Sequence, residues 1–244
     1  MTEGANRERE SSTRRQVLCC AGAGALGFAG GWFVRGHQRT SPASEVRPEN
    51  APQALARLRE GNQRFVEGNV RHGHEGRTWR AALVADQHPF AVILGCSDSR
   101  VPIELVFDQG FGDLFVIRVA GNVISTDVLG SIGYAVEHLH TRLLLVMGHE
   151  GCGAVTAALR VQDAVNEPPN IAALVRLIGP GLRGLDPNLA GAARLSAAVE
   201  ANLRWSMRQL AAQPAGQRLL ESGQLVLAAA VYELETGRVR YLET

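Results

Sequence analysis

The chain has 244 residues, and its 25 basic and 24 acidic side chains leave a formal net charge of +1 at pH 7. All the basic residues other than histidine are arginines, and they are interspersed with acids instead of forming a basic stripe. Because aromatic residues are also few, the chain lacks the charged and stacking surfaces that nucleic-acid binding requires, and we expect no nucleic acid among its partners.

The first 43 residues have the pattern of an export signal. Arg14 and Arg15 precede an apolar, glycine-rich segment, 17–34, which suits an export signal better than a permanent membrane span. A twin arginine in this position addresses the bacterial route that exports folded proteins, and residues 41–43 offer a cleavage site. We therefore expect residues 1–43 to engage the twin-arginine export machinery. The location would be periplasmic or otherwise extracytoplasmic, with membrane anchoring as the alternative if the signal is not cleaved.

Residues 44–244 are long enough for one globular domain with a substantial core. The hydrophobic pattern predicts helices at 48–67, 102–107, 126–140 and 190–211, a helical region after residue 152 with a break at 179–181, and strands at 90–94, 114–119, 143–147, 225–234 and 238–242. Alternating strands and helices predict an α/β fold with a mostly parallel central sheet flanked by helices. The short turn between the last two strands predicts an antiparallel hairpin at the sheet edge.

The most informative residues follow two of these strands. Cys96, Asp98 and Arg100 come after the run 90–94, and His149 and Cys152 come after the run 143–147. Ligands of parallel sheets gather beyond the carboxyl ends of the strands, so these side chains are expected to meet at one edge. Two Cys and one His are a natural ligand set for Zn²⁺, and three protein ligands leave the fourth position open, as in catalytic sites.

Two other interpretations of the cysteines are less satisfactory. Cys96 and Cys152 could be buried structural residues beside a core histidine, or they could form a disulfide in an oxidising compartment. Either alternative leaves the combination of His149, Asp98 and Arg100 without a joint explanation. A zinc site is therefore the preferred hypothesis.

Three segments, CSDSRVP (96–102), GDLFVIRVAGN (112–122) and LLLVMGHEGCGAV (143–155), together resemble the β-class carbonic anhydrases. The resemblance extends from about Pro48 to the C-terminus. It implies one zinc ion per subunit, a homodimer or higher even oligomer, and a dimer interface that contributes to each active site. The implied zinc ligands are Cys96, His149 and Cys152, and the implied substrate-binding residues are Gln87, Phe115, Ala120, Gly121, Tyr134 and Gly153.

The resemblance implies reversible hydration of CO₂ to bicarbonate and a proton by attack of a zinc-bound hydroxide. Zinc lowers the pKa of its bound water, and Asp98 is placed to accept a hydrogen bond from it. Arg100 would keep Asp98 ionised and aim it through a bidentate pair, so that the two form a catalytic dyad. Phe115, Ala120 and Gly121 suit a dry slot for CO₂, and the amide of Gln87 could donate to the oxygen that gains charge.

Several alternatives stay open. Asp98 could itself be a fourth zinc ligand, but Ile93 stands where family members that hold an inhibitory bicarbonate carry Trp, so we favour an open site. Val119 replaces an Asn that many relatives carry. A hydrolase of carbonyl sulfide or carbon disulfide, or a non-catalytic zinc-binding protein, are the competing functions. His72 and His74 could relay protons, although a solvated loop is the preferred interpretation of their segment.

Overall fold

The computed structural model describes residues 47–160 and 167–243, all of which belong to one compact unit. The expected export signal and the expected domain boundary after residue 43 lie outside the described residues. Within the described ranges, no helix combines the length and the apolar character needed to span a membrane.

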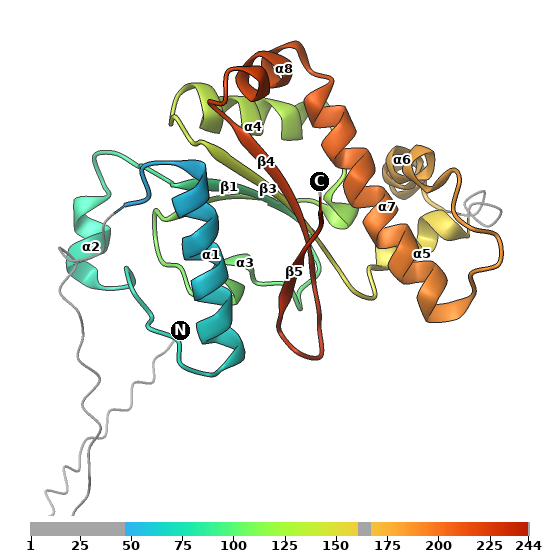
Figure 1. Ribbon diagram of the computed structural model, residues 1–244, viewed down its shortest axis with the longest axis horizontal. Coiled ribbons are helices and arrows are strands. Elements are labelled where there is room, and N and C mark those ends of the chain that lie inside the picture. Colours follow the sequence, from blue (N-terminus) through green and yellow to red (C-terminus); the bar gives the residue numbers. More distant parts are fainter. Residues whose placement is uncertain (1–46, 161–166, 244) are drawn as a thin grey trace, which may run out of the picture. The chain divides into compact units, whose positions relative to one another are not determined.

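A five-stranded sheet forms the centre of this unit, in the order β2-β1-β3-β4-β5 (Figure 1). The strands are β1 (Ala91–Gly95), β2 (Leu114–Arg118), β3 (Leu143–His149), β4 (Val226–Tyr232) and β5 (Val239–Tyr241). The first four are mutually parallel and β5 runs antiparallel to β4. The predicted α/β fold, with its mostly parallel sheet and antiparallel edge hairpin, is confirmed.

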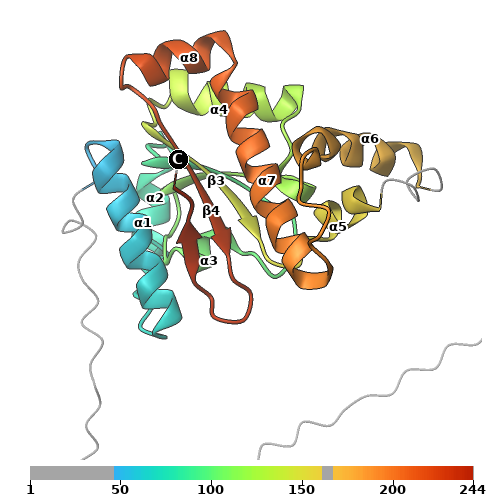
Figure 2. The same ribbon diagram turned by 45° about the vertical axis from the view of Figure 1, so that its right-hand side comes forward.

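Helices cover both faces of the sheet, as the two views in Figures 1 and 2 show. The helices are α1 (Ala51–Val66), α2 (Arg77–Ala82), α3 (Ile103–Val106), α4 (Thr126–Glu137), α5 (Gly153–Leu159), α6 (Pro169–Ile178), α7 (Gly191–Ala211) and α8 (Pro214–Glu221), with 3₁₀ turns η2 (Ala120–Asn122) and η4 (Gly179–Leu182). One hydrophobic core lies between the sheet and α1 and α3, and a larger one lies between the sheet and α4 to α8. Every residue of β1 and β3 is buried, which explains why these strands are uninterrupted apolar runs.

The element boundaries depart from the predictions in a few places. The helix predicted at 126–140 ends earlier than expected: α4 ends at Glu137, and the chain turns through His140, whose φ is +55°. β3 extends through His149, so this residue ends the strand instead of following it. The short helices α2 and α8 were not predicted, because neither carries a long apolar stripe in the sequence.

Candidate metal centre

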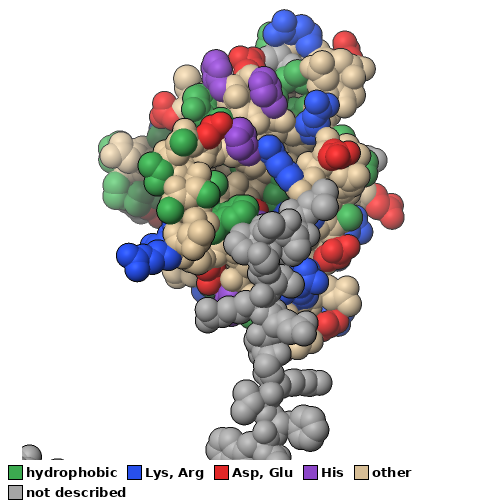
Figure 3. Space-filling view, turned by 90° about the vertical axis from the view of Figure 1, so that its left-hand side faces the viewer, with side chains coloured by type: hydrophobic (Ala, Val, Ile, Leu, Met, Phe, Trp, Pro, Cys, Tyr) green, Lys and Arg blue, Asp and Glu red, His purple; other side chains and the backbone are tan. Residues whose placement is uncertain are grey.

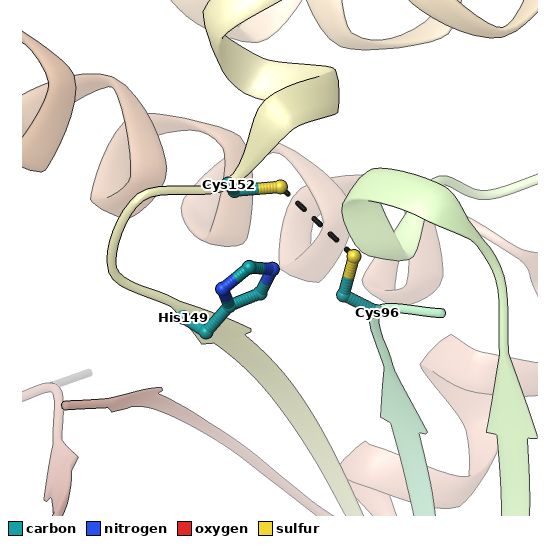
Figure 4. A group of neighbouring side chains, drawn as sticks. All are labelled: Cys96, His149 and Cys152. Carbon is teal, nitrogen blue, oxygen red and sulfur yellow. Dashed lines mark hydrogen bonds between the residues drawn. The ribbon is translucent and has the colours of Figure 1, made fainter. Parts of the chain in front are cut away.

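Cys96, His149 and Cys152 meet beyond the carboxyl ends of two neighbouring parallel strands (Figure 4). Cys96 directly follows β1, His149 is the last residue of β3, and Cys152 is the N-cap of α5. The Sγ atoms of the two cysteines are 4.0 Å apart, and the three possible ligand atoms all lie within 4.8 Å of one another. All three side chains are buried, and both cysteines are free thiols. The predicted ligand set is therefore brought together.

Two glycines allow this approach. Gly95, the last residue of β1, has no room for a side chain, because a Cβ would lie 2.5 Å from Cδ1 of Ile103. Gly151, between His149 and Cys152, has a φ of +64°, which glycine adopts without steric cost. The chain can thus turn sharply after His149 and bring Cys152 back over the sheet edge.

The imidazole of His149 is held in one orientation. Its Nδ1 lies 2.8 Å from the backbone oxygen of Glu150, and since a carbonyl only accepts, Nδ1 carries the proton and donates it. Nε2 is then a lone-pair acceptor, and this buried atom has no hydrogen-bond partner among the described residues. An orphaned imidazole nitrogen facing two thiols is the arrangement expected of a metal ligand whose second nitrogen is fixed by a carbonyl.

The pKa values of the two thiols are shifted in opposite directions. Donation from the Cys152 thiol lowers the pKa of Cys96 to about 4, against the opposing effect of burial, with further help from the backbone N–H of Gly121. The same contact raises the pKa of Cys152, and burial raises it further. Two close thiols, one of them favoured as the thiolate, fit a thiolate-rich zinc site in which a divalent cation would bind both sulfur atoms.

A carboxylate–guanidinium pair borders the three ligands. The Asp98 carboxylate accepts hydrogen bonds from Nε (2.9 Å) and an NH₂ group (2.8 Å) of Arg100, and also from the Arg100 backbone N–H (3.0 Å). These hydrogen bonds hold the pKa of Asp98 well below its usual range and raise that of Arg100. The Oδ2 atom of Asp98 is 3.8 Å from Nε2 of His149, so an ionised acceptor lies beside the ligand set.

The other expected site residues fall into two groups. Gly121 lies beside the ligands, because its N–H donates to Cys96 Sγ over 3.3 Å; Ala120 precedes it, and Gly153 follows Cys152. Phe115 and Tyr134 form a second group, with ring centroids 6.3 Å apart. Phe115 pairs with Val92, near the beginning of β1, whereas the ligands lie beyond the end of that strand.

Gln87 also lies on the amino side of the sheet, since it is an exposed residue that precedes β1. A single chain thus does not bring Gln87, Phe115 and Tyr134 to the ligands. Their role in substrate binding stays a prediction, and it requires a second subunit.

The structure adds two residues that the sequence analysis missed. Arg118, at the end of β2, donates to the backbone oxygens of Cys96 (3.0 Å) and Asp98 (2.7 Å), so it braces the loop that carries both. Asn202 of α7 donates to the Gly121 oxygen over 2.9 Å. An arginine closing an apolar strand was a visible signal for the first. The second gave no signal, because 81 residues separate the partners.

The interpretation of the 71–77 segment as a solvated loop is wrong for His74. The His74 ring stacks on Trp79 at a centroid distance of 3.8 Å, and its Nδ1 lies 2.8 Å from both carboxylate oxygens of Asp113. Only 8% of its side chain is exposed. His72, by contrast, is 62% exposed, as that interpretation requires.

A mostly parallel sheet with a buried Cys-His-Cys cluster at its carboxyl edge is the arrangement expected of an α/β metalloenzyme. The family model described as carbonic anhydrase matches residues 91–239, which include all three candidate ligands. The chain belongs to the β-carbonic anhydrase family and is thus a carbonate dehydratase. Membership of this family implies zinc-dependent hydration of CO₂.

Individual relatives support this family assignment. Carbonic anhydrase 2 of Mycobacterium tuberculosis is 39% identical over 191 residues, which cover 78% of this chain and 91% of that protein. The carbonic anhydrase of Mycolicibacterium smegmatis is 38% identical over 192 residues, covering 78% and 92%. Among solved structures, the β-carbonic anhydrase CcaA matches with a TM-score of 0.66 and 30% identity, covering 78% of this chain and 95% of that one. Coccomyxa β-carbonic anhydrase in complex with acetazolamide matches with a TM-score of 0.61 and 27% identity, covering 77% and 86%.

Proposed function

We propose that this chain hydrates CO₂ reversibly to bicarbonate and a proton, using Zn²⁺ held by Cys96, His149 and Cys152. The observation that carries the proposal is Nε2 of His149, a buried atom that has no hydrogen-bond partner among the described residues and is turned toward two thiols 4.0 Å apart. Neutral imidazole and thiolate are the ligands that zinc prefers. When bound, Zn²⁺ lowers the pKa of a coordinated water and so supplies a nucleophile at neutral pH.

Asp98 and Arg100 supply the assistance that a site with two thiolate ligands needs. Asp98 stays ionised because Arg100 donates to both of its oxygens, so it can accept a hydrogen bond from the attacking water and orient it. The same pairing restrains Asp98 from approaching the ligands, which favours an open fourth position. A crystal structure of the zinc-loaded protein with a carboxylate oxygen of Asp98 on the metal would contradict this part of the proposal.

The substrate pocket is proposed to combine residues of two subunits. Gly121 contacts Cys96, Ala120 precedes Gly121 and Gly153 follows Cys152, so the residues next to the ligands are small, as a small linear substrate requires. Gln87, Phe115 and Tyr134 would come from the partner in a homodimer or higher even oligomer. Tyr134 is 47% exposed and Phe111 50% exposed, and Figure 3 shows hydrophobic side chains at the surface among arginines and acids. Sedimentation equilibrium tests this directly, and a monomer would contradict it.

The N-terminal residues carry a separate proposal. Arg14 and Arg15, followed by the apolar segment 17–34, support export by the twin-arginine route to a periplasmic or other extracytoplasmic location. Replacing both arginines with lysine should retain the enzyme in the cytoplasmic fraction. Unchanged fractionation of that variant would contradict the proposed route.

The enzymatic proposal is tested by stopped-flow CO₂ hydration with the zinc-loaded full-length protein between pH 6 and 9. The expected result is fast hydration that rises with pH. A zinc-replete protein that is inactive toward CO₂ at the alkaline end would contradict the proposal. Parallel assays with carbonyl sulfide and carbon disulfide separate the related hydrolase from a zinc protein without catalytic activity, which would act on none of the three.

A further inference from the structure

We propose that Asn202 is a positioning residue of the metal centre, acting from the buried face of α7 through the turn η2. Its side chain holds the backbone of Gly121 so that the Gly121 N–H donates to Sγ of Cys96. The inference rests on the proposed zinc site, and it concerns a residue that touches neither metal nor substrate.

The contacts form a continuous buried chain. Asn202 Nδ2 donates to the Gly121 oxygen over 2.9 Å, and the Gly121 N–H donates to Cys96 Sγ over 3.3 Å. One turn further along α7, Ser206 Oγ donates to the Asn122 oxygen over 3.3 Å. Asn202 and Ser206 are 2% and 1% exposed. Two polar side chains of one helix thus hold two consecutive carbonyls of the turn that faces the ligand.

The turn needs this support because its backbone is unusual. Gly121 has a φ of +68° and Asn122 a φ of +44°, and a non-glycine residue in the left-handed region is uncommon. A side chain at Gly121 would also collide, since a Cβ would lie 2.7 Å from Cδ1 of Ile178 and 3.1 Å from Cβ of Ala154. Packing and hydrogen bonds from elsewhere in the fold therefore determine where the Gly121 N–H points.

A hydrogen bond to a ligand sulfur affects both its position and its electron donation. An N–H donor draws electron density from the thiolate, so the sulfur neutralises less of the charge of its metal. Groups that hold metal ligands from outside typically contribute about 10- to 100-fold to metal affinity or activity. Without the Asn202 amide, the buried Gly121 oxygen would lose its donor, and the turn would rearrange to satisfy it.

The test compares Asn202→Leu with Asn62→Leu, a matched control on the opposite face of the sheet. Asn62, on α1, is likewise buried, and its amide donates to the oxygens of Val106 (3.1 Å) and Gly237 (2.8 Å). Full-length proteins are loaded with Co²⁺, and the thiolate-to-cobalt charge-transfer absorption and the rate of metal loss to a chelator are measured. We expect Asn202→Leu to shift the absorption band and to lose metal about 10-fold faster, whereas Asn62→Leu leaves both unchanged.

Equal behaviour of the two variants would overturn the inference and assign Asn202 a packing role. If Asn202→Leu does not fold, Asn202→Ser keeps a hydroxyl donor, as in Ser206, and should shift the band in the same direction by a smaller amount; an unshifted band would again overturn the inference. A wild-type protein that binds Co²⁺ without any sulfur-to-metal band would instead refute the zinc site itself.

Discussion

Two buried polar clusters lie at opposite ends of the sheet, and they differ in whether the protein itself supplies hydrogen-bond partners for their polar atoms. At the amino end, the carboxylate of Asp113 accepts hydrogen bonds from Arg57 (3.0 Å), His74 (2.8 Å) and the Gly110 N–H (2.9 Å), and we call this the Asp113 cluster. At the carboxyl end, the candidate metal centre holds two thiols 4.0 Å apart, and among the described residues Nε2 of His149 has no hydrogen-bond partner.

The comparison shows what distinguishes a ligand site from a structural network. Both clusters contain a buried histidine. The Asp113 cluster includes an Asp–Arg ion pair and the candidate metal centre borders one, so residue types alone do not separate the two clusters. The Asp113 cluster pairs its carboxylate within the protein, which stabilises the fold without any ligand. The candidate metal centre leaves Nε2 of His149 without a hydrogen-bond partner among the described residues, and a bound cation would satisfy that lone pair.

The largest effect is expected from Cys152→Ser, which removes a ligand from the metal centre. The variant should lose its zinc, and kcat/KM for CO₂ hydration should fall at least about 1000-fold, or ~4 kcal/mol of transition-state stabilisation. Atomic emission and stopped-flow assays measure the two quantities. A zinc-free variant with wild-type activity would remove the metal from the mechanism.

Asp113→Asn should lower the stability of the fold and leave metal binding unchanged, the opposite of what is expected for Cys152→Ser. Arg57 and His74 would lose their charged acceptor, and breaking a buried ion pair should lower the free energy of unfolding by about 3 kcal/mol while the zinc content stays the same. Urea unfolding measures the change. Glu200→Gln, which breaks the exposed pair with Arg240, is the control and should change stability by less than about 1 kcal/mol. Loss of zinc from Asp113→Asn would abolish the distinction between the clusters.

Asp98→Ala separates metal binding from catalysis. Because Asp98 is proposed to orient the attacking water and not to ligate, its loss should lower kcat/KM by about 100-fold with zinc retained. Stopped-flow assays and metal analysis on the same sample give both numbers. Loss of zinc in parallel with activity would instead indicate that Asp98 is a ligand.

The smallest change in stability is expected at Tyr241. This residue tests whether a single buried polar atom without a hydrogen-bond partner is enough to indicate a ligand site. Its hydroxyl is buried without a partner among the described residues, and burial raises the pKa of Tyr241 to about 12. The Arg59 guanidinium lies over the Tyr241 ring, 4.2 Å from its centroid, but the described residues give the hydroxyl no hydrogen bond. The hydroxyl should therefore only cost stability, and Tyr241→Phe should raise the free energy of unfolding by about 1 kcal/mol at pH 7.

The pH dependence of that variant has a definite sign. In the unfolded chain the tyrosine ionises near pH 10, so the wild-type protein should lose stability as the pH rises from about 10 to 12. Tyr241→Phe lacks this loss, and its advantage should therefore grow over that interval. Urea unfolding at pH 7 and above pH 10 measures it; an advantage that shrinks with pH would contradict the assignment.

The candidate metal ligands and the strands that they follow could be predicted because both are local signals. Cys96 and His149 each follow an uninterrupted apolar run, and parallel strands place such positions at one edge. The Asp113 cluster could not be predicted, since its partners are 39 and 56 residues distant and the histidine loop looks hydrophilic. Asn202 was equally invisible, because a helix sequence does not reveal which buried carbonyl its amide will meet.

X-ray absorption at the zinc edge of the purified full-length protein tests the central claim most directly. The account predicts zinc with two sulfur ligands at about 2.3 Å, one imidazole nitrogen and one further light atom. Cys152→Ser, which should lose its zinc, should give no such two-sulfur signal. A zinc ion without sulfur ligands in the wild-type protein, or a two-sulfur shell that survives the substitution, would place the metal elsewhere and contradict the account.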